Sequence, residues 1–258
     1  MISGGIYRDI WKICRETMQI SQDKEERIIQ NRQIAAYLEP REFKQHEQEL
    51  LAMIQIDYPQ FNGHMLDIGC ATGNFIQAMQ AHYPEANYTG IDISADLISI
   101  ARTRLTEDNV YLLVEDVLRY QPVTTFDMII ASGVLSIFEE FEPVLDRWLS
   151  WLKKGGRVYI FGRFNSRNID TIIRFRNNYV GGDWEGGLTS YAVHTVANYL
   201  EARGFRYTFK RFYLNVELAE RDDPIRTYTI PCVDGSRLVV NGANTIAEHY
   251  FLTISKPG

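Results

Sequence analysis

Four small or acidic residues in the first half of the chain have the types and spacing needed to bind a nucleoside. Asp67, Gly69 and Gly73 lie in the run MLDIGCATGNF, and Asp92 follows at the expected end of the next strand. Glycines at these positions allow the backbone to turn tightly and to come close to a ligand. The Asp92 carboxylate could accept hydrogen bonds from both hydroxyls of a ribose. The order of strand, small-residue loop, helix, strand and acid therefore predicts a βαβ nucleoside-binding unit.

The loop after the first strand separates two classes of nucleoside cofactor. A dinucleotide fingerprint requires Gly-x-Gly-x-x-Gly, so that a pyrophosphate can reach the helix N-terminus. Here Gly69 is followed by Ala71 and Asn74, so the second and third glycines of that fingerprint are missing. Asp67, two residues before Gly69, would attract an ammonium group and repel a pyrophosphate. The loop therefore disfavours NAD and NADP.

The same stretch resembles the first motif of the class I S-adenosylmethionine-dependent methyltransferases, usually Asp/Glu-x-Gly-x-Gly-x-Gly. The departure is Ala71, which stands at the middle glycine. Further matches follow in register at Asp92, at Asp116 and in the run FDMIIASGVL at 126–135. The resemblance covers residues 60–165 well and the C-terminal third in outline. It implies S-adenosyl-L-methionine as the cofactor.

The resemblance also implies roles for single residues. Asp92 would hold the ribose hydroxyls, Asp116 would contact the adenine amino group, and Val117 would pack on the adenine ring. Asp67 would contact the cofactor directly or through water, although it could instead satisfy loop amides, and Asp116 could be an ordinary strand-end residue. The implied cofactor-binding residues are Asp67, Gly69, Cys70, Ala71, Gly73, Asp92, Ile93, Asp116, Val117 and Ser132.

Alternating apolar and amphipathic segments predict a Rossmann-like, doubly wound α/β sheet that is mostly parallel. The expected strands are 64–69, 87–92, 110–115, 126–131 and 157–162, and the expected helices are 74–82, 95–105 and 141–153. Lys153-Lys154-Gly155-Gly156 is expected to end the last of these helices and to form a turn. Ser94 is expected to cap the helix at 95–105.

The C-terminal part resembles the methyltransferase ending, whose last strand inserts antiparallel between its neighbours. A helix is expected at 190–203, and strands at 205–214 and 249–254. A β-hairpin is expected at 226–241 with Asp234-Gly235 as its turn, inside an insertion at about 216–246 on or near the substrate side.

Residues 1–56 precede the first strand and have a helical pattern. Apolar residues recur at three- and four-residue spacing over 27–38. Pro40 interrupts that pattern, and a second helix is expected from 41 to about 56. Because the segment is too short and polar for a strong core of its own, we expect an N-terminal helical lid at 1–56 over a methyltransferase domain at 57–258.

Composition limits the class of protein. The net charge of −6 and the isoelectric point near 5.5 oppose a large nucleic-acid contact surface. The scattered cysteines and histidines show no metal-ligand spacing, and no apolar run is long enough to span a bilayer. We therefore expect a cytoplasmic monomer or homodimer that acts on a small molecule, with no metal and no nucleic-acid or membrane partner.

The chemistry that the resemblance implies needs few catalytic groups. A methyl group on a sulfonium is already electrophilic, so the protein must mainly orient the acceptor and exclude water. A general base is needed only where the acceptor must lose a proton, and His194 and Glu185 are candidates for it. Arg163, after the fifth strand on the expected substrate side, is a third catalytic candidate. Trp184, in a glycine-rich loop, is expected either to line the substrate site or to anchor its loop.

The sequence restricts the acceptor in part. The exit of the fourth strand, ASGV, lacks the Asn-Pro-Pro-aromatic pattern of enzymes that methylate amide or adenine amino nitrogens. No cysteine lies directly after the fourth or fifth strand to serve a covalent pyrimidine mechanism. We therefore expect in-line transfer to an oxygen, nitrogen or activated carbon of a small molecule. Two alternatives stay open: a tRNA or protein methyltransferase of the same fold, and a nucleoside-cofactor-binding protein without methyl transfer.

Overall fold

A mixed, mostly parallel β-sheet runs through the computed structural model, which describes residues 43–178, 184–220 and 225–258. Its strand order is β3-β2-β1-β4-β5-β11-β7. The strands are β1 (His64–Ile68), β2 (Asn87–Asp92), β3 (Val110–Val114), β4 (Phe126–Ser132), β5 (Leu152–Asn165), β7 (Arg206–Phe212) and β11 (His249–Ser255). The short β6 (Tyr191–Ala192) pairs with the end of β5.

The last strand is the antiparallel member of this sheet. β11 pairs antiparallel with both β5 and β7, with Phe251 opposite Phe161 on one side and Lys210 on the other. The pairs β2–β3, β1–β2, β1–β4 and β4–β5 are all parallel. The Rossmann-like sheet with an inserted antiparallel last strand is therefore confirmed.

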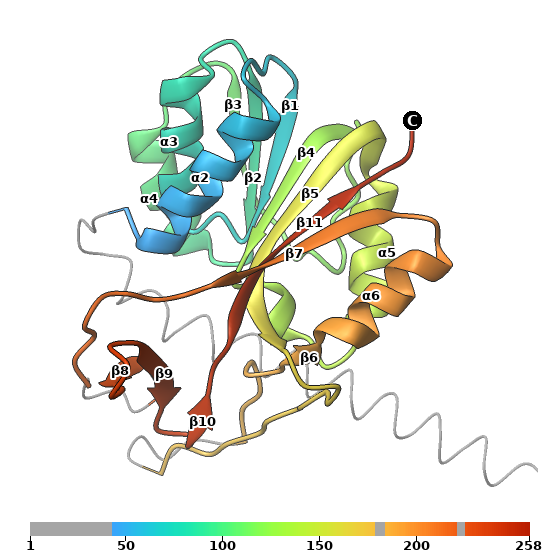
Figure 1. Ribbon diagram of the computed structural model, residues 1–258. Helices are drawn as coiled ribbons and strands as arrows, with labels where there is room; N and C mark the ends of the chain where they lie inside the picture. The colour runs from blue at the N-terminus through green and yellow to red at the C-terminus, as the bar shows by residue number, and fades with distance from the viewer. Residues whose placement is uncertain (1–42, 179–183, 221–224) are drawn as a thin grey trace, which may run out of the picture.

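Helices cover both faces of the sheet (Figure 1). One face packs against α2 (Gln45–Asp57), α3 (Asn74–His82) and α4 (Ala95–Arg104). The other packs against α5 (Glu142–Ser150) and α6 (Val193–Ala202), next to the short 3-10 helix η1 (Leu135–Ile137). Because both faces are covered, β4 is an almost continuous buried apolar run instead of an alternating one.

The N-terminal segment enters the described structure at residue 43. Its helix α2 buries Leu50, Leu51 and Ile54 in the core on the α3–α4 face. The helix expected at 27–38 lies outside the described residues. The division of the chain at residue 56 stays a prediction.

The turn expected at Lys153-Lys154-Gly155-Gly156 is wrong. α5 ends at Ser150 and β5 begins at Leu152, so these four residues belong to the strand. The Gly155 N–H donates to the Lys256 carbonyl (3.1 Å), and the Lys256 N–H donates to the Gly156 carbonyl (3.0 Å). The local signal for a helix end was overridden by pairing with a strand a hundred residues later in the chain, which sequence periodicity does not reveal.

The expected hairpin is present within a separate three-stranded sheet. β8 (Tyr228–Pro231) and β9 (Arg237–Asn241) pair antiparallel, and β10 (Thr245–Ile246) adds a third strand. Gly235 has φ +81° in the connecting turn. Because β11 follows β10 directly and runs antiparallel to β5, the small sheet lies beyond the carboxyl end of β5 (Figure 1). None of the helices in the described ranges combines the length and apolar character that a bilayer crossing requires.

Candidate functional site

The loop between β1 and α3 is held in an unusual backbone conformation. Gly69, Ala71 and Gly73 all have positive φ, at 70°, 48° and 76°. For Ala71 this left-handed conformation costs about 1–2 kcal/mol because its Cβ approaches the carbonyl. The Ala71 N–H donates to the Asp92 carboxylate at 3.0 Å, which fixes the loop to the tip of β2.

Asp92 connects the ends of the first two strands. One of its oxygens accepts from Ala71, and the other accepts from the Ser94 N–H at 2.9 Å. Each carboxylate oxygen has a second acceptor site, so two further hydrogen bonds can be accepted. Burial raises the pKa of Asp92, while the two backbone hydrogen bonds act in the opposite direction. Ser94 caps α4 as expected, accepting from the Leu97 N–H at 3.4 Å.

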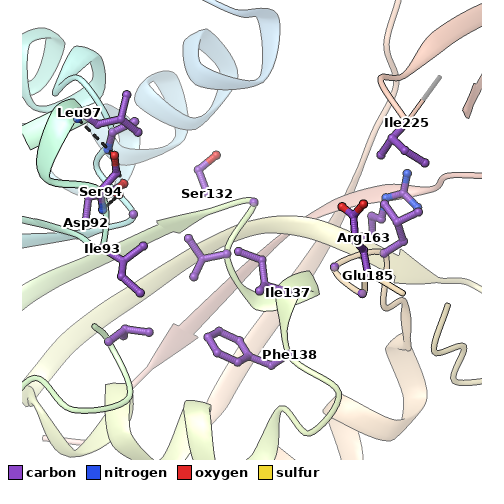
Figure 2. Close-up of a pocket in the computed structure, with 18 of the residues that line it drawn as sticks. Asp92, Ile93, Ser94, Leu97, Ser132, Ile137, Phe138, Arg163, Glu185 and Ile225 are labelled. Atoms are coloured by element: carbon purple, nitrogen blue, oxygen red, sulfur yellow. Dashed lines mark hydrogen bonds between the residues drawn. The ribbon is translucent and has the colours of Figure 1, made fainter. Parts of the chain in front are cut away.

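A cavity of about 430 Å³ joins the tips of β1–β4 to the end of β5. Figure 2 shows Asp92 and Ser94 at one end, Arg163 and Glu185 at the other, and Ser132, Ile137 and Phe138 between them. Ligands of open α/β sheets bind at this carboxyl edge of the strands. The predicted site residues that line the cavity are Gly69, Ala71, Asp92, Ile93, Asp116, Val117, Ser132, Arg163 and Glu185.

Three of the predicted cofactor-binding residues lie behind the cavity wall. Asp67 is 4% exposed, and burial, together with the charges of Asp92 and Glu47, raises its pKa well above the usual range. Cys70 is also buried, and burial raises the pKa of its thiol. A Cβ on Gly73 would stand 2.5 Å from Leu105. That glycine therefore serves the packing of the loop on α4.

Asp116 has two structural contacts as well as a position in the cavity. One carboxylate oxygen accepts from the Leu118 N–H at 2.9 Å, and the other lies 3.5 Å from the Arg119 guanidinium. The side chain therefore shapes the turn after β3. It also faces the cavity next to Val117, where the sequence placed it.

The catalytic candidates are separated by the structure. Arg163 and Glu185 line the cavity. His194 is exposed on α6, where its ring lies 3.1 Å from the Asn198 amide, and it is not among the lining residues. Trp184 is 60% exposed and packs under the Arg176 guanidinium, away from the cavity lining. Of the two base candidates, only Glu185 is placed to meet a substrate.

Sequence reasoning missed the walls that come from long loops. Phe175 and Leu188 line the cavity, as do Ile225, Arg226 and Thr227. Phe175 and Glu185 exchange two backbone hydrogen bonds of 2.9 and 2.8 Å. The Thr189 N–H donates to the Ser136 carbonyl at 3.1 Å. Two signals in the sequence pointed towards these walls. The glycines at 181–187 mark a loop without showing where it folds, and the insertion expected at about 216–246 on the substrate side contains Ile225, Arg226 and Thr227.

Residues 66–158 match the family model described as a methyltransferase domain. This part of the chain is a class I S-adenosylmethionine-dependent methyltransferase domain. The cofactor of this family is S-adenosyl-L-methionine. The matched residues contain the loop after β1, Asp92, Asp116 and the whole of β4, which are the elements that form one end of the cavity.

Two sequence relatives are also methyltransferases, and one solved structure has a similar fold. The chain is 28% identical over 127 residues to malonyl-[acyl-carrier protein] O-methyltransferase 2 of Ilyobacter polytropus, covering 45% of this chain and 49% of that protein. It is 31% identical over 108 residues to trans-aconitate 2-methyltransferase of Rhodopseudomonas palustris, covering 42% and 40%. The structure of a DhpI–SAH complex has a TM-score of 0.58 at 14% identity, covering 92% of this chain and 97% of that one, which supports the fold. The matches span half or less of each sequence relative.

Proposed function

We propose that this protein transfers a methyl group from S-adenosyl-L-methionine to a small-molecule acceptor bound in the 430 Å³ cavity. The observation that carries the proposal is the continuity of this cavity. It joins the motif residues at the tips of β1–β3 to a second set of side chains at the end of β5, so two ligands can meet within one cavity. A cavity of this size favours a small acceptor over a nucleic acid or a folded protein.

The residues at the Asp92 end suit the proposed cofactor. The second acceptor sites on the Asp92 carboxylate suit ribose hydroxyls, and Asp116 with Val117 suits an adenine. Asp67, Asp92 and Glu47 place three carboxyl groups around the β1 loop. A cationic ligand would favour their charged form, whereas a pyrophosphate would oppose it. When bound, S-adenosyl-L-methionine supplies a methyl group on a positively charged sulfur, which is electrophilic without further activation.

The residues at the other end would hold the acceptor. Leu188, together with Ile137 and Phe138 from the middle of the cavity, provides apolar walls that exclude water, while Arg163 and Glu185 provide polar contacts. Orientation by such walls can supply on the order of 7–11 kcal/mol of the barrier reduction. Where the acceptor must lose a proton, Glu185 is the residue placed to take it. The acceptor atom is an oxygen, a nitrogen or an activated carbon.

The names of the relatives support a small acceptor. One is named for a malonyl group carried on acyl-carrier protein and the other for trans-aconitate. We propose an acceptor of comparable size, either free or attached to a carrier. Helix α2 is packed in the core, so the lid expected at 1–56 is proposed only for the part of that segment before α2. A chain lacking residues 1–40 would then bind cofactor but transfer methyl poorly.

Calorimetry and labelling test the proposal together. S-adenosyl-L-methionine and S-adenosyl-L-homocysteine should bind with saturation, and NADH should not. Methyl-labelled cofactor is then incubated with host extract that has been separated into small molecules, RNA and protein. We expect label in the small-molecule fraction. Label in RNA or protein would favour the alternative enzymes of the same fold, and cofactor binding without any labelled product would favour a binding protein.

A further inference from the structure

Arg163 stands at the acceptor end of the cavity on a fixed backbone. It lies on β5, two residues before the strand ends, and pairs with His249 of β11 in the register of the sheet. Its backbone N–H donates to the Ser136 hydroxyl of η1 at 3.1 Å. The side chain faces the cavity at the end opposite Asp92 (Figure 2). Its position is therefore set by main-chain contacts from two neighbouring elements.

The Arg163 guanidinium is a cation without a protein counter-charge in the described part of the chain. No ion pair or hydrogen bond of a described residue engages it. Other arginines in the same ranges do form such pairs, with Arg157 lying 2.6 Å from Asp57 and Arg211 lying 3.0 Å from Glu248. Burial lowers the pKa of Arg163 to about 10, which leaves it charged at neutral pH. Burying such a charge costs free energy unless something pairs with it.

The surroundings of Arg163 define what could pair with it. His249 is neutral at neutral pH because burial and the Arg163 charge lower its pKa to about 4. Glu185 and Arg226 line the same end of the cavity. The anionic group of a ligand would supply the counter-charge that the Arg163 guanidinium lacks among the described residues.

The remaining lining supports a carboxylate attached to an apolar body. Phe138 and Leu188 are buried, and Phe175 lies next to them in the cavity wall. A planar guanidinium can donate two parallel hydrogen bonds to a carboxylate. We propose that Arg163 binds a carboxylate of the methyl acceptor, so that the acceptor belongs to the class of small carboxylic acids. This inference rests on the proposed methyl transfer and adds to it the class of substrate.

The first test removes the carboxylates from the acceptor pool. The full-length protein and labelled S-adenosyl-L-methionine are incubated with three equal parts of a small-molecule extract. One part is untreated, one is treated with carbodiimide and methylamine so that carboxylates become neutral amides, and one is treated with phosphatase. We expect label in the untreated and phosphatase-treated parts and its loss from the amidated part. Label that survives amidation, or that is lost only after phosphatase, overturns the carboxylate assignment.

The second test changes the arginine. Arg163→Gln should raise the KM for the acceptor pool about 10- to 100-fold while changing kcat less. Arg163→Lys keeps the charge but loses the paired donors, so its KM should lie between those of the unchanged protein and Arg163→Gln. Arg167→Gln, at an exposed arginine four residues later, is the control and should match the unchanged protein. An unchanged KM in Arg163→Gln would show that the guanidinium does not hold the acceptor.

The outcomes separate this inference from the proposed function. Absence of label in all three extract parts contradicts the proposed methyl transfer and removes the inference with it. Label that is insensitive to amidation leaves methyl transfer standing and overturns the inference alone. Binding of S-adenosyl-L-homocysteine to Arg163→Gln, measured by calorimetry, shows that the variant is folded and that its defect lies at the acceptor.

Discussion

The two ends of the cavity are built in different ways. At the Asp92 end, short turns between consecutive strands and helices place acidic side chains, and backbone hydrogen bonds from Ala71 and Ser94 fix them. At the Arg163 end, the walls come from the end of β5 and from long loops that reach Phe175, Leu188 and Thr227. The charged residues that line the first end are acidic, whereas the second has Arg163 and Arg226 beside Glu185.

This difference suggests how one domain can keep the same cofactor site while the loops around its acceptor site change in sequence. The acidic end depends on loops only a few residues long, so changes there disturb the sheet tips directly. The arginine end depends on long loops joined by isolated β-bridges, such as those between Phe175 and Glu185 and between Thr171 and Ser190. Loops of that kind can change sequence without altering the scaffold. The following predictions test whether the two ends are as independent as this account requires.

Asp92→Ala should have the largest effect. Loss of two charge-assisted hydrogen bonds, each of about 1.5–3 kcal/mol, should weaken S-adenosyl-L-methionine binding about 100-fold or more. Calorimetry measures the dissociation constant, and circular dichroism checks that the sheet is retained. Asp96→Ala, at an exposed acid in the first turn of α4, is the control. An unchanged dissociation constant in Asp92→Ala would remove this residue from the cofactor site.

His249 should make the arginine end sensitive to acid. Its pKa in the folded protein is lowered to about 4 from 6.5, chiefly by burial and then by the charge of Arg163. The unfolded chain therefore takes up the proton first, so the free energy of unfolding should fall as pH drops from 6.5 towards 4. The fall should reach about 1 kcal/mol per pH unit.

His249→Phe should remove this part of the acid sensitivity, because it keeps a ring stacked on Phe161 without a titrating group. Chemical denaturation at several pH values measures the difference between the two proteins. His194→Phe, at an exposed histidine, is the comparison variant. Parallel pH profiles for the unchanged protein and His249→Phe would mean that this end is more hydrated than its geometry indicates.

Ala71→Gly should have a small effect of opposite sign. Glycine adopts the left-handed conformation without strain, so the free energy of unfolding should rise by about 1 kcal/mol. Asn244→Gly, at an exposed residue with φ 57°, should gain less because asparagine tolerates this conformation better. Urea denaturation distinguishes them. A loss of stability in Ala71→Gly would show that the loop is not strained.

The sequence predicted the elements at the Asp92 end of the cavity better than the walls at the Arg163 end. The helix at 74–82 and the strand at 87–92 were predicted with the bounds that the structure has, because short-range periodicity determines them. The position of Phe175 depends on pairing with Glu185. β5 begins early because Leu152 pairs with Phe126 of β4 and because Lys256 pairs with Gly155 and Gly156. Such long-range contacts leave no periodic signal.

The role of Gly73 shows the same limit on a smaller scale. The motif indicated a glycine at this position and implied close approach to a ligand. The structure places its open side against Leu105, at the end of α4. The residue type was therefore predictable from the pattern, whereas the neighbour that requires it could be found only from the packed structure.

The separation of the two ends is tested most directly by binding of S-adenosyl-L-homocysteine to Arg163→Gln and Asp92→Ala, measured side by side by calorimetry. The account predicts that Arg163→Gln binds the ligand within about twofold of the unchanged protein, since the two residues lie at opposite ends of the cavity, and that Asp92→Ala binds it about 100-fold more weakly. Equal losses in the two variants, or a loss confined to Arg163→Gln, would contradict the assignment of the cofactor to the acidic end.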